Sequence, residues 1–226
     1  MTTGFRPRDE LPKESRMDYD ESFWDERYRQ HGLHGSVWSG QPNPQLVAEV
    51  AELEPGSALD VGAGEGADAA WLARHGWRVT AVDISSVALS RAADAVRDDP
   101  ATASRITWQH ADLTVAPPPA GTFDLVTAQY LHLPPEQRPD VYQRLAASVA
   151  PRGTLLIVGH HPSDLETTVR RPSLPGLLFT AEQIAAELDG EDWEVVTCAA
   201  RARAASDAEG TPVTVHDAVL RARRRP

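Results

Sequence analysis

The sequence contains one cysteine, Cys198, among 226 residues. A lone cysteine excludes an intrachain disulfide and a cysteine-based metal cluster. No apolar run approaches the roughly 20 residues that span a bilayer, and the first 18 residues are too polar and charged for a secretory signal. We therefore expect a cytoplasmic location and no membrane partner.

Basic residues are also scarce. The 22 Lys and Arg residues face 33 Asp and Glu residues, which gives a formal net charge of −11. A nucleic-acid substrate requires a basic surface, so this balance argues against one. The basic run Arg221–Arg225 is short, and we expect it to be a solvated tail. The chain length predicts one α/β domain with a small appendage.

Three closely spaced glycines lie in the stretch Ala58–Gly66. An apolar strand runs into Gly62, Gly64 and Gly66, and a helix-forming segment follows. Such a turn lets a ligand approach the backbone N–H groups at the start of a helix. Nicotinamide dinucleotides and S-adenosylmethionine (SAM) both use turns of this kind, and the spacing Gly62-x-Gly64-x-x-Ala67 also fits the relaxed dinucleotide fingerprint.

Two carboxylates favour SAM. Asp60 lies two residues before the first glycine, where it would repel a pyrophosphate and attract a sulfonium or α-ammonium group. Asp83 ends the next expected strand, Val79–Asp83, and is placed to accept both hydroxyls of a ribose. A tight turn with two solvated acids is the structural alternative.

The stretches LDVGAGEG (59–66) and VTAVDIS (79–85) resemble motifs I and II of the class I SAM-dependent methyltransferases. The resemblance covers about residues 40 to 222. It implies an α/β fold with a doubly wound, Rossmann-like, seven-stranded and mostly parallel sheet, in which strand seven is antiparallel. The chain then divides into an N-terminal arm and aromatic helical cap (1–43) and a methyltransferase domain (44–226). Small enzymes of the tellurite-resistance and thiopurine type are the most similar group.

The resemblance also implies the cofactor, SAM, and its product, S-adenosyl-L-homocysteine (SAH). Asp112, in the stretch His110–Leu113, matches the position where an acid accepts the adenine amino group in this family, although an acid after a short strand is also ordinary turn chemistry. The residues expected to bind the cofactor are Asp60, Gly62, Ala63, Gly64, Asp83, Ile84, Asp112, Leu113 and Gln129.

An aromatic helix precedes the domain. The pairs Tyr19/Phe23 and Trp24/Tyr28 are spaced i,i+4 on one helix face. We expect this helix to begin with a capping box at Ser22 and to end at Gly32. Its aromatic stripe can pack over the domain, form a lid over the ligands, or do both. The residues expected to contact the substrate are Trp24, Tyr28, Trp38, Tyr130 and His132.

The elements after the glycine turn alternate between strands and helices. We expect strands at 79–83, 106–109, 123–128, 154–158, 193–197 and 213–220. Before the turn we expect a helix at 44–53, capped by Asn43 with Pro44 at its first position. After it we expect helices at 67–74, at 86–97 with Ser85 or Ser86 as the cap, and at 135–150, with a capped helix from Thr180. An irregular stretch is expected from Gly159 to about Leu178, and its four prolines or glycines between 162 and 176 predict a loop or short helix that covers the site.

Methyl transfer from SAM is an in-line displacement, so a base is needed only when the acceptor arrives protonated. Histidine suits that role. His132 is the first choice because it follows strand four, and His160 or His161 is the second. A structural hydrogen bond or an exposed position is the alternative for each. His160, His161 and Asp164 could ligate a metal, but adjacent histidines converge poorly, and we expect no metal.

We therefore predict a SAM-dependent methyltransferase that acts on an O or N atom of a small aromatic or heterocyclic molecule, as a monomer or homodimer. Methylation of a thiol, a thiopurine or tellurite is the runner-up. The (N/D)PP(Y/F/W) motif of amino methyltransferases is absent after strand four, which again argues against nucleic acid. Asp60 and the lack of a Tyr-x-x-x-Lys pair disfavour an NAD-dependent oxidoreductase. A non-catalytic SAM-binding protein is a further alternative.

Overall fold

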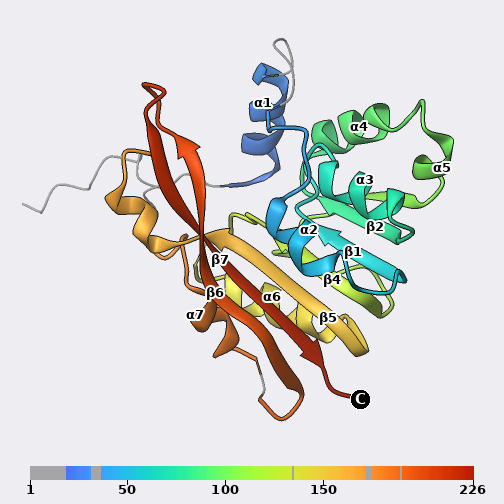
Figure 1. Cartoon of the computed structure of the whole chain (residues 1–226). Helices are drawn as coiled ribbons and strands as arrows, with labels where there is room; N and C mark the ends of the chain where they lie inside the picture. Colours follow the sequence, from blue (N-terminus) through green and yellow to red (C-terminus); the bar gives the residue numbers. More distant parts are fainter. Residues whose placement is uncertain (1–18, 32–36, 134, 172–174, 189) are drawn as a thin grey trace, which may run out of the picture.

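A seven-stranded sheet runs through the centre of the molecule in the order β3-β2-β1-β4-β5-β7-β6 (Figure 1). The computed structural model describes residues 19–31, 37–133, 135–171, 175–188 and 190–226. Strands β1 to β5 pair in parallel, and β7 is antiparallel to both β5 and β6. This is the predicted sheet. The strands are β1 (Ser57–Val61), β2 (Arg78–Asp83), β3 (Ile106–His110), β4 (Phe123–Gln129), β5 (Val149–His160), β6 (Trp193–Ser206) and β7 (Pro212–Arg224).

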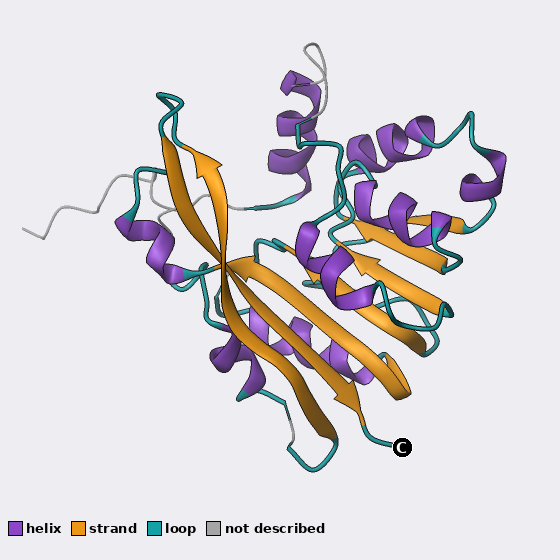
Figure 2. Ribbon diagram, viewed as in Figure 1, coloured by secondary structure: helices purple, strands orange, loops and turns teal. Residues whose placement is uncertain are grey.

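Helices cover both faces of the sheet (Figure 2). On one face α2 (Pro44–Val50) and α3 (Ala67–Arg74) pack against side chains such as Val158 and Val219. On the other, α6 (Arg138–Ala147) and α7 (Ala181–Ala185) pack against Ile157 and Leu220. Alternate residues of β5 and β7 therefore serve opposite cores, which explains their continuous apolar sequences. Helices α4 (Ser86–Ala95) and α5 (Pro100–Ala103) lie at the β3 end of the sheet (Figure 1).

Three predicted helix caps are present. The Asn43 side chain accepts the N–H of Gln45, and Pro44 occupies the first position of α2. Ser85 accepts the N–H of Ala88 at the start of α4. Thr180 and Gln183 form a reciprocal capping box at α7.

The expected start of the aromatic helix was wrong. Helix α1 (Glu21–His31) begins one residue before Ser22, and the carboxylate of Asp20 accepts the N–H of Phe23. Ser22 instead donates its hydroxyl proton to Asp20. Aspartate is the stronger cap because it is charged and lies at the positive end of the helix. The predicted end at Gly32 and the arm at 1–18 lie outside the described residues.

The connection from α6 to β5 also differs from expectation. The helix begins at Arg138 and ends at Ala147, and Val149 belongs to β5 instead of the helix expected at 135–150. Val149 pairs with Phe123, and the register shifts between Phe123 and Leu125. Arg152 then turns the chain at a positive φ of 67°. A β-bulge of this kind leaves no periodic signature in the sequence. The short α5 was not predicted either.

The hairpin of β6 and β7 is much longer than its apolar pattern suggested. Pairing between β5 and β7 ends at His160 and Asp217, whereas β6 and β7 continue to pair as far as Ser206 and Pro212. The two strands thus extend past the sheet as a ribbon, which we call the β6–β7 ribbon (Figure 1). Residues 199–205 contain only alanine and arginine, which have little β propensity, so the cross-strand ladder decides their conformation. No helix among the described residues is long and apolar enough to cross a membrane.

Candidate active site

A cavity of about 840 Å³ opens at the carboxyl ends of β1, β2, β4 and β5. Ligands of doubly wound sheets bind at this edge. The predicted site residues that line it are Trp24, Tyr28, Trp38, Gly62, Ala63, Gly64, Asp83, Ile84, Asp112, Leu113, Gln129, Tyr130, His132 and His160. Asp60 and His161 do not belong to its lining.

The glycine turn requires glycine for two reasons. Gly62, Gly64 and Gly66 have φ values of +72°, +54° and +79°, which L side chains rarely adopt. A Cβ on Gly64 would also lie 2.9 Å from the hydroxyl of Tyr28. A Cβ on Gly66 would lie 2.6 Å from the ring of Trp108. The turn is therefore shaped by its own backbone and by the aromatic side chains around it.

Three carboxyl groups gather beside this turn, of which Asp60 and Asp83 are buried and Asp68 is partly buried. Asp83 accepts N–H groups from Gly64 and Ser85, each at 2.8 Å, and burial raises its pKa. Burial raises the pKa of Asp68 to about 6. Asp60 is 1% exposed, and burial together with repulsion from Asp68 and Asp83 raises its pKa well above the ordinary value. A cationic ligand group would be stabilised here because it would relieve this repulsion.

Two acceptor atoms in this region lack donors. The Oδ2 atom of Asp60 and the Oε1 atom of Gln129 are buried and have no hydrogen-bond partner among the described residues. Asp60 pairs with Thr127 in the β1–β4 register, and Gln129 follows Thr127 by two positions, so both side chains lie on one face of adjoining strands. Buried polar atoms are normally satisfied, so this face is suited to a ligand that donates hydrogen bonds.

Asp112 lies on the cavity wall in a local turn. Its Oδ1 accepts both the N–H and the hydroxyl of Thr114, at 2.8 and 2.7 Å. This is the ordinary turn chemistry named as the alternative. Asp112 nevertheless belongs to the cavity lining, and its second oxygen takes no part in these two bonds.

Helix α1 places an aromatic wall over the turn. Tyr28 is 3% exposed and accepts a 3.0 Å hydrogen bond from the indole N–H of Trp38. The helix is anchored by Asp25, which accepts the hydroxyl of Ser85 at 2.6 Å and the N–H of Val87. Thus α1 is attached to the start of α4 through a carboxylate that the sequence analysis did not single out.

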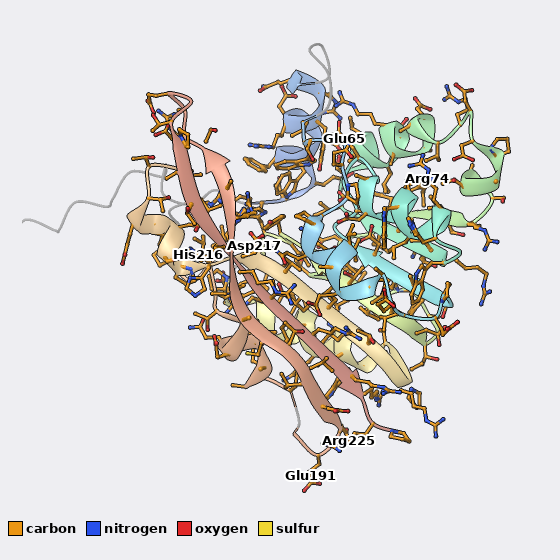
Figure 3. All side chains as sticks on the ribbon, viewed as in Figure 1. Glu65, Arg74, Glu191, His216, Asp217 and Arg225 are labelled. Carbon is orange, nitrogen blue, oxygen red and sulfur yellow. The ribbon has the colours of Figure 1, made fainter. Side chains whose placement is uncertain are left out.

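The loop that carries Trp38 is fixed by Glu65 of the glycine turn (labelled in Figure 3). The Glu65 carboxylate accepts the backbone N–H groups of Val37 at 2.9 Å and Trp38 at 3.4 Å, and it pairs with Arg91. One residue of the turn therefore positions a cavity-lining aromatic side chain. The sequence offered one indication of this role, because Glu65 is a charged side chain between Gly64 and Gly66.

Two of the three predicted histidines line the cavity. The rings of His132 and His160 lie 5.9 Å apart, and His160 stacks on Tyr130 at 4.3 Å. Burial lowers the pKa of His132 to about 4 and that of His160 to about 2. Both rings are therefore neutral near pH 7.

His161 lies apart from this pair. Its Nδ1 accepts the N–H of Ser163 and caps the 3₁₀ helix η2 (Pro162–Glu166). This is the structural hydrogen bond named as the alternative to catalysis. No three histidine, cysteine or carboxylate side chains in the described part of the chain are placed to hold a metal ion.

Sequence reasoning missed two arginines of the cavity wall, Arg171 and Arg203. Arg171 comes from the segment after η2, and Arg203 from the β6–β7 ribbon. Each pairs with a fully buried aspartate, Asp164 and Asp217 respectively. The sequence indicated Arg203 only as an arginine within an alanine-rich segment. The strand that contains it was predicted to end at residue 197.

Comparison with known proteins supports the fold and relates part of the chain to methyltransferases. Residues 58–153 match the family model of a methyltransferase domain. This segment of the chain is therefore similar to a methyltransferase domain. An uncharacterized methyltransferase of Mycobacterium tuberculosis is 40% identical over 113 residues, which is 50% of this chain and 55% of that protein. The same match is found in Mycobacterium bovis. The chain thus spans about half the length of the curated relatives it matches.

Solved structures share the fold over nearly the whole chain. TehB from Haemophilus influenzae aligns with a TM-score of 0.67 and 19% identity, over 91% of this chain and 67% of that one. The N-methyltransferase NodS from Bradyrhizobium japonicum, solved with SAH, aligns with a TM-score of 0.67 and 18% identity, over 90% and 99% of the two chains. At these identities the comparison establishes the fold alone.

Binding of SAM or SAH is typical of this family, and the residues present fit that cofactor. The acceptor atoms of Asp60 and Gln129 lack donors, and the three acids beside the turn favour positive charge. An α-ammonium group supplies three donors and one positive charge. A dinucleotide pyrophosphate would bring two negative charges to the same acids.

Proposed function

We propose that this protein is a methyltransferase that moves the methyl group of SAM to an O or N atom of a small aromatic or heterocyclic molecule. One observation carries the proposal. A single cavity joins the acid-lined glycine turn to a wall of aromatic rings, with Tyr28, Trp24 and His132 among its lining. Such a cavity can hold a cofactor at one end and a planar acceptor at the other.

The acid-lined end suits the cofactor. SAM, when bound, supplies an activated methyl group on a sulfonium. Asp83 and Asp112 would accept hydrogen bonds from the ribose and the adenine amino group, and Gln129 would accept one from the α-ammonium group. Asp60, buried behind the cavity wall, would stabilise the positive charge of that group. Asp83 uses each oxygen once for a backbone N–H, and a carboxylate oxygen has a second lone pair for a ribose hydroxyl.

Helix α1 would act as a cap over both ligands, as the division at residue 43 implies. Its Trp24 ring lies 5.9 Å from His132, and Tyr19 stacks on the same histidine. A cap of this kind excludes water and aligns the acceptor with the methyl group.

The acceptor's proton would pass to His132, whose neutral ring has a free lone pair near pH 7. Burial lowers the pKa of this histidine to about 4. A base of that strength removes a proton only as the acceptor's own acidity rises during transfer. The same weak basicity favours the second candidate, methylation of a thiol, thiopurine or tellurite, which requires no base when the acceptor is already ionised.

Incubation of the purified protein with methyl-labelled SAM and a panel of phenols, heterocyclic amines, thiols and tellurite tests both candidates. We expect mass spectrometry to find labelled O- or N-methyl products. Products confined to sulfur or tellurium would establish the second candidate instead. SAH binding without turnover on any acceptor would indicate a non-catalytic SAM-binding protein, and NAD-dependent redox turnover would contradict the proposal entirely.

A further inference from the structure

Arg171 and Arg203 lie in the cavity wall, yet the proposed methyl transfer gives them no role. Their side chains are 12% and 29% exposed, and each has a carboxylate partner that is completely buried. A partly buried arginine loses favourable hydration, and this loss destabilises the protein unless a carboxylate of the protein or an anionic ligand pairs with the side chain. The arrangement of the two arginines therefore indicates which charged group the methyl acceptor carries.

Arg171 is held from behind by Asp164. Its Nε and Nη2 atoms donate to Oδ2 of Asp164 at 3.0 and 2.9 Å. The other oxygen of Asp164 accepts the backbone N–H of His216 at 2.8 Å. The Nη1 atom of Arg171 takes no part in this ion pair.

Arg203 is held in the same way by Asp217. Its Nε donates to both carboxylate oxygens, at 3.0 and 3.1 Å. Asp217 also accepts the Tyr130 hydroxyl at 2.8 Å and the Gln45 amide at 3.2 Å. Both terminal nitrogens of Arg203 remain outside the ion pair.

Both ion pairs are connected to neighbouring residues of β7 where the β6–β7 ribbon leaves the sheet (labelled in Figure 3): Asp164 accepts the backbone N–H of His216, and Asp217 is the partner of Arg203. Asp217 is the register partner of His160 on β5, so both side chains lie on the same face. Both arginines also act on His160: after burial, which is the largest cause, the charges of Arg171 and Arg203 further lower its pKa. The two guanidinium groups thus meet at the end of the cavity where His160 lies.

Charge divides the cavity into two ends. Asp83, Asp68 and Asp112 belong to its lining near the glycine turn, whereas Arg171 and Arg203 belong to its lining beside His160 and Tyr130. Asp164 and Asp217 are 0% exposed, so the ion pairs present their positive groups toward the cavity. A ligand at this end meets guanidinium groups from two directions.

We propose that Arg171 and Arg203 bind a carboxylate group on the methyl acceptor. This inference rests on the proposed function. The planar guanidinium group suits a carboxylate because its N–H donors form a fork. The rings of Tyr130, His132 and Trp24 line the same end of the cavity, and they favour an aromatic acid over a small inorganic oxyanion. The carboxylate would orient the acceptor with its reactive atom toward the glycine turn, and a cationic acceptor would be rejected.

Binding to the SAH-loaded protein tests this without any turnover. Benzoate, benzamide and sulfate would each be titrated by calorimetry. We expect benzoate to bind at least ~10-fold more tightly than benzamide, because only benzoate forms charge-assisted hydrogen bonds. Equal affinities would overturn the inference, and so would sulfate binding in preference to benzoate.

Variants locate the effect. R171Q and R203Q should each weaken benzoate binding about 10-fold and leave the affinities for benzamide and SAH unchanged. The control variant R97Q, at an exposed arginine after α4, should change none of the three affinities. Because R203Q leaves Asp217 buried without its cation, R203K and the double variant R203M/D217N provide a second measurement. R203K keeps the charge but loses the fork, and the double variant removes both charges.

R203K and R203M/D217N should both bind benzoate more weakly than the wild-type protein and should still bind SAH. A wild-type affinity for benzoate in these two variants would overturn the inference. The two proposals fail separately. If the wild-type protein does not bind SAH, the methyltransferase proposal is refuted. If it binds SAH but does not prefer benzoate to benzamide, only the arginine site is refuted.

Discussion

The hydroxyl of Tyr130 donates a 2.8 Å hydrogen bond to Asp217, and this bond joins the end of β4 to the root of the β6–β7 ribbon. Tyr130 lies at a φ of 51°, which is unfavourable for a residue with a side chain. The hydrogen bond and the stacking on His160 at 4.3 Å hold the ring in this position. Strain at one residue is thus balanced by a buried carboxylate 87 positions later.

Tyr130→Phe should reduce the free energy of unfolding by about 1–2 kcal/mol, because Asp217 loses one of its hydrogen-bond donors. It should also raise the KM for the acceptor and leave SAH affinity unchanged. Urea unfolding and steady-state kinetics measure these effects. Tyr142→Phe, at another buried tyrosine on α6, is the control and should leave the KM unaltered. An unchanged acceptor KM in Tyr130→Phe would show that the Tyr130 hydroxyl and its bond to Asp217 do not help to position the acceptor.

Asp83→Ala should weaken SAH binding by roughly 100-fold, because the ribose would lose its charged acceptor. The N–H groups of Gly64 and Ser85 would also lose their partner, so the protein should be less stable as well. Calorimetry on the folded variant measures the affinity. Asp98→Ala, at an exposed aspartate, serves as the control. Wild-type affinity in Asp83→Ala would remove the ribose assignment.

The pH profile of catalysis should report the buried state of His132. An ordinary histidine base protonates near pH 6.5, but burial lowers the pKa of His132 to about 4. Its neutral, basic form therefore persists as the pH falls, and kcat/KM should stay level from pH 8 to about pH 5 and decline only near pH 4. A decline centred near pH 6.5 would contradict the role of a buried neutral ring.

Removing the ring provides a second test of the same role. His132→Ala should lower kcat by about 10²–10⁴-fold on a protonated acceptor and leave SAH affinity intact. His75→Ala, at an exposed histidine of the α3 C-cap, is the matched control. Full turnover of a protonated acceptor by His132→Ala would exclude it as the base, and full turnover restricted to thiols or tellurite would favour the second candidate function.

Gly64→Ala should destabilise the protein by roughly 1–2 kcal/mol and weaken SAH binding. Its φ of +54° disfavours a side chain, and the added Cβ would lie 2.9 Å from the Tyr28 hydroxyl. Thermal unfolding and calorimetry would detect both changes. Gly190→Ala, where a Cβ meets nothing within 4 Å, should change neither. Unaltered SAH affinity in Gly64→Ala would mean that the turn tolerates a side chain near the cofactor.

The sequence predicted the parts of the fold whose cause is local. The glycine turn, the acid at the end of β2 and the caps at Asn43, Ser85 and Thr180 depend on a few adjacent residues, and each was found where expected. The carboxyl-edge rule then placed most predicted site residues on one cavity.

The parts that the sequence did not predict depend on distant partners. Arg203 reaches the cavity only because β6 continues beyond the sheet, and its alanine-rich neighbours conceal that strand. Asp25 anchors α1 through Ser85, 60 positions away, and nothing near Asp25 indicates this. The early start of β5 follows from a register shift opposite Phe123. Tertiary pairing decides all three, and local patterns do not contain it.

Calorimetric titration of the purified protein with SAM, SAH and NAD tests the central claim most directly. The account predicts micromolar binding of SAM and SAH and no binding of NAD, because Asp60, Asp68 and Asp83 favour a cation beside the glycine turn. Binding of NAD without SAM or SAH would contradict it, since the same acids would then have to accommodate a pyrophosphate.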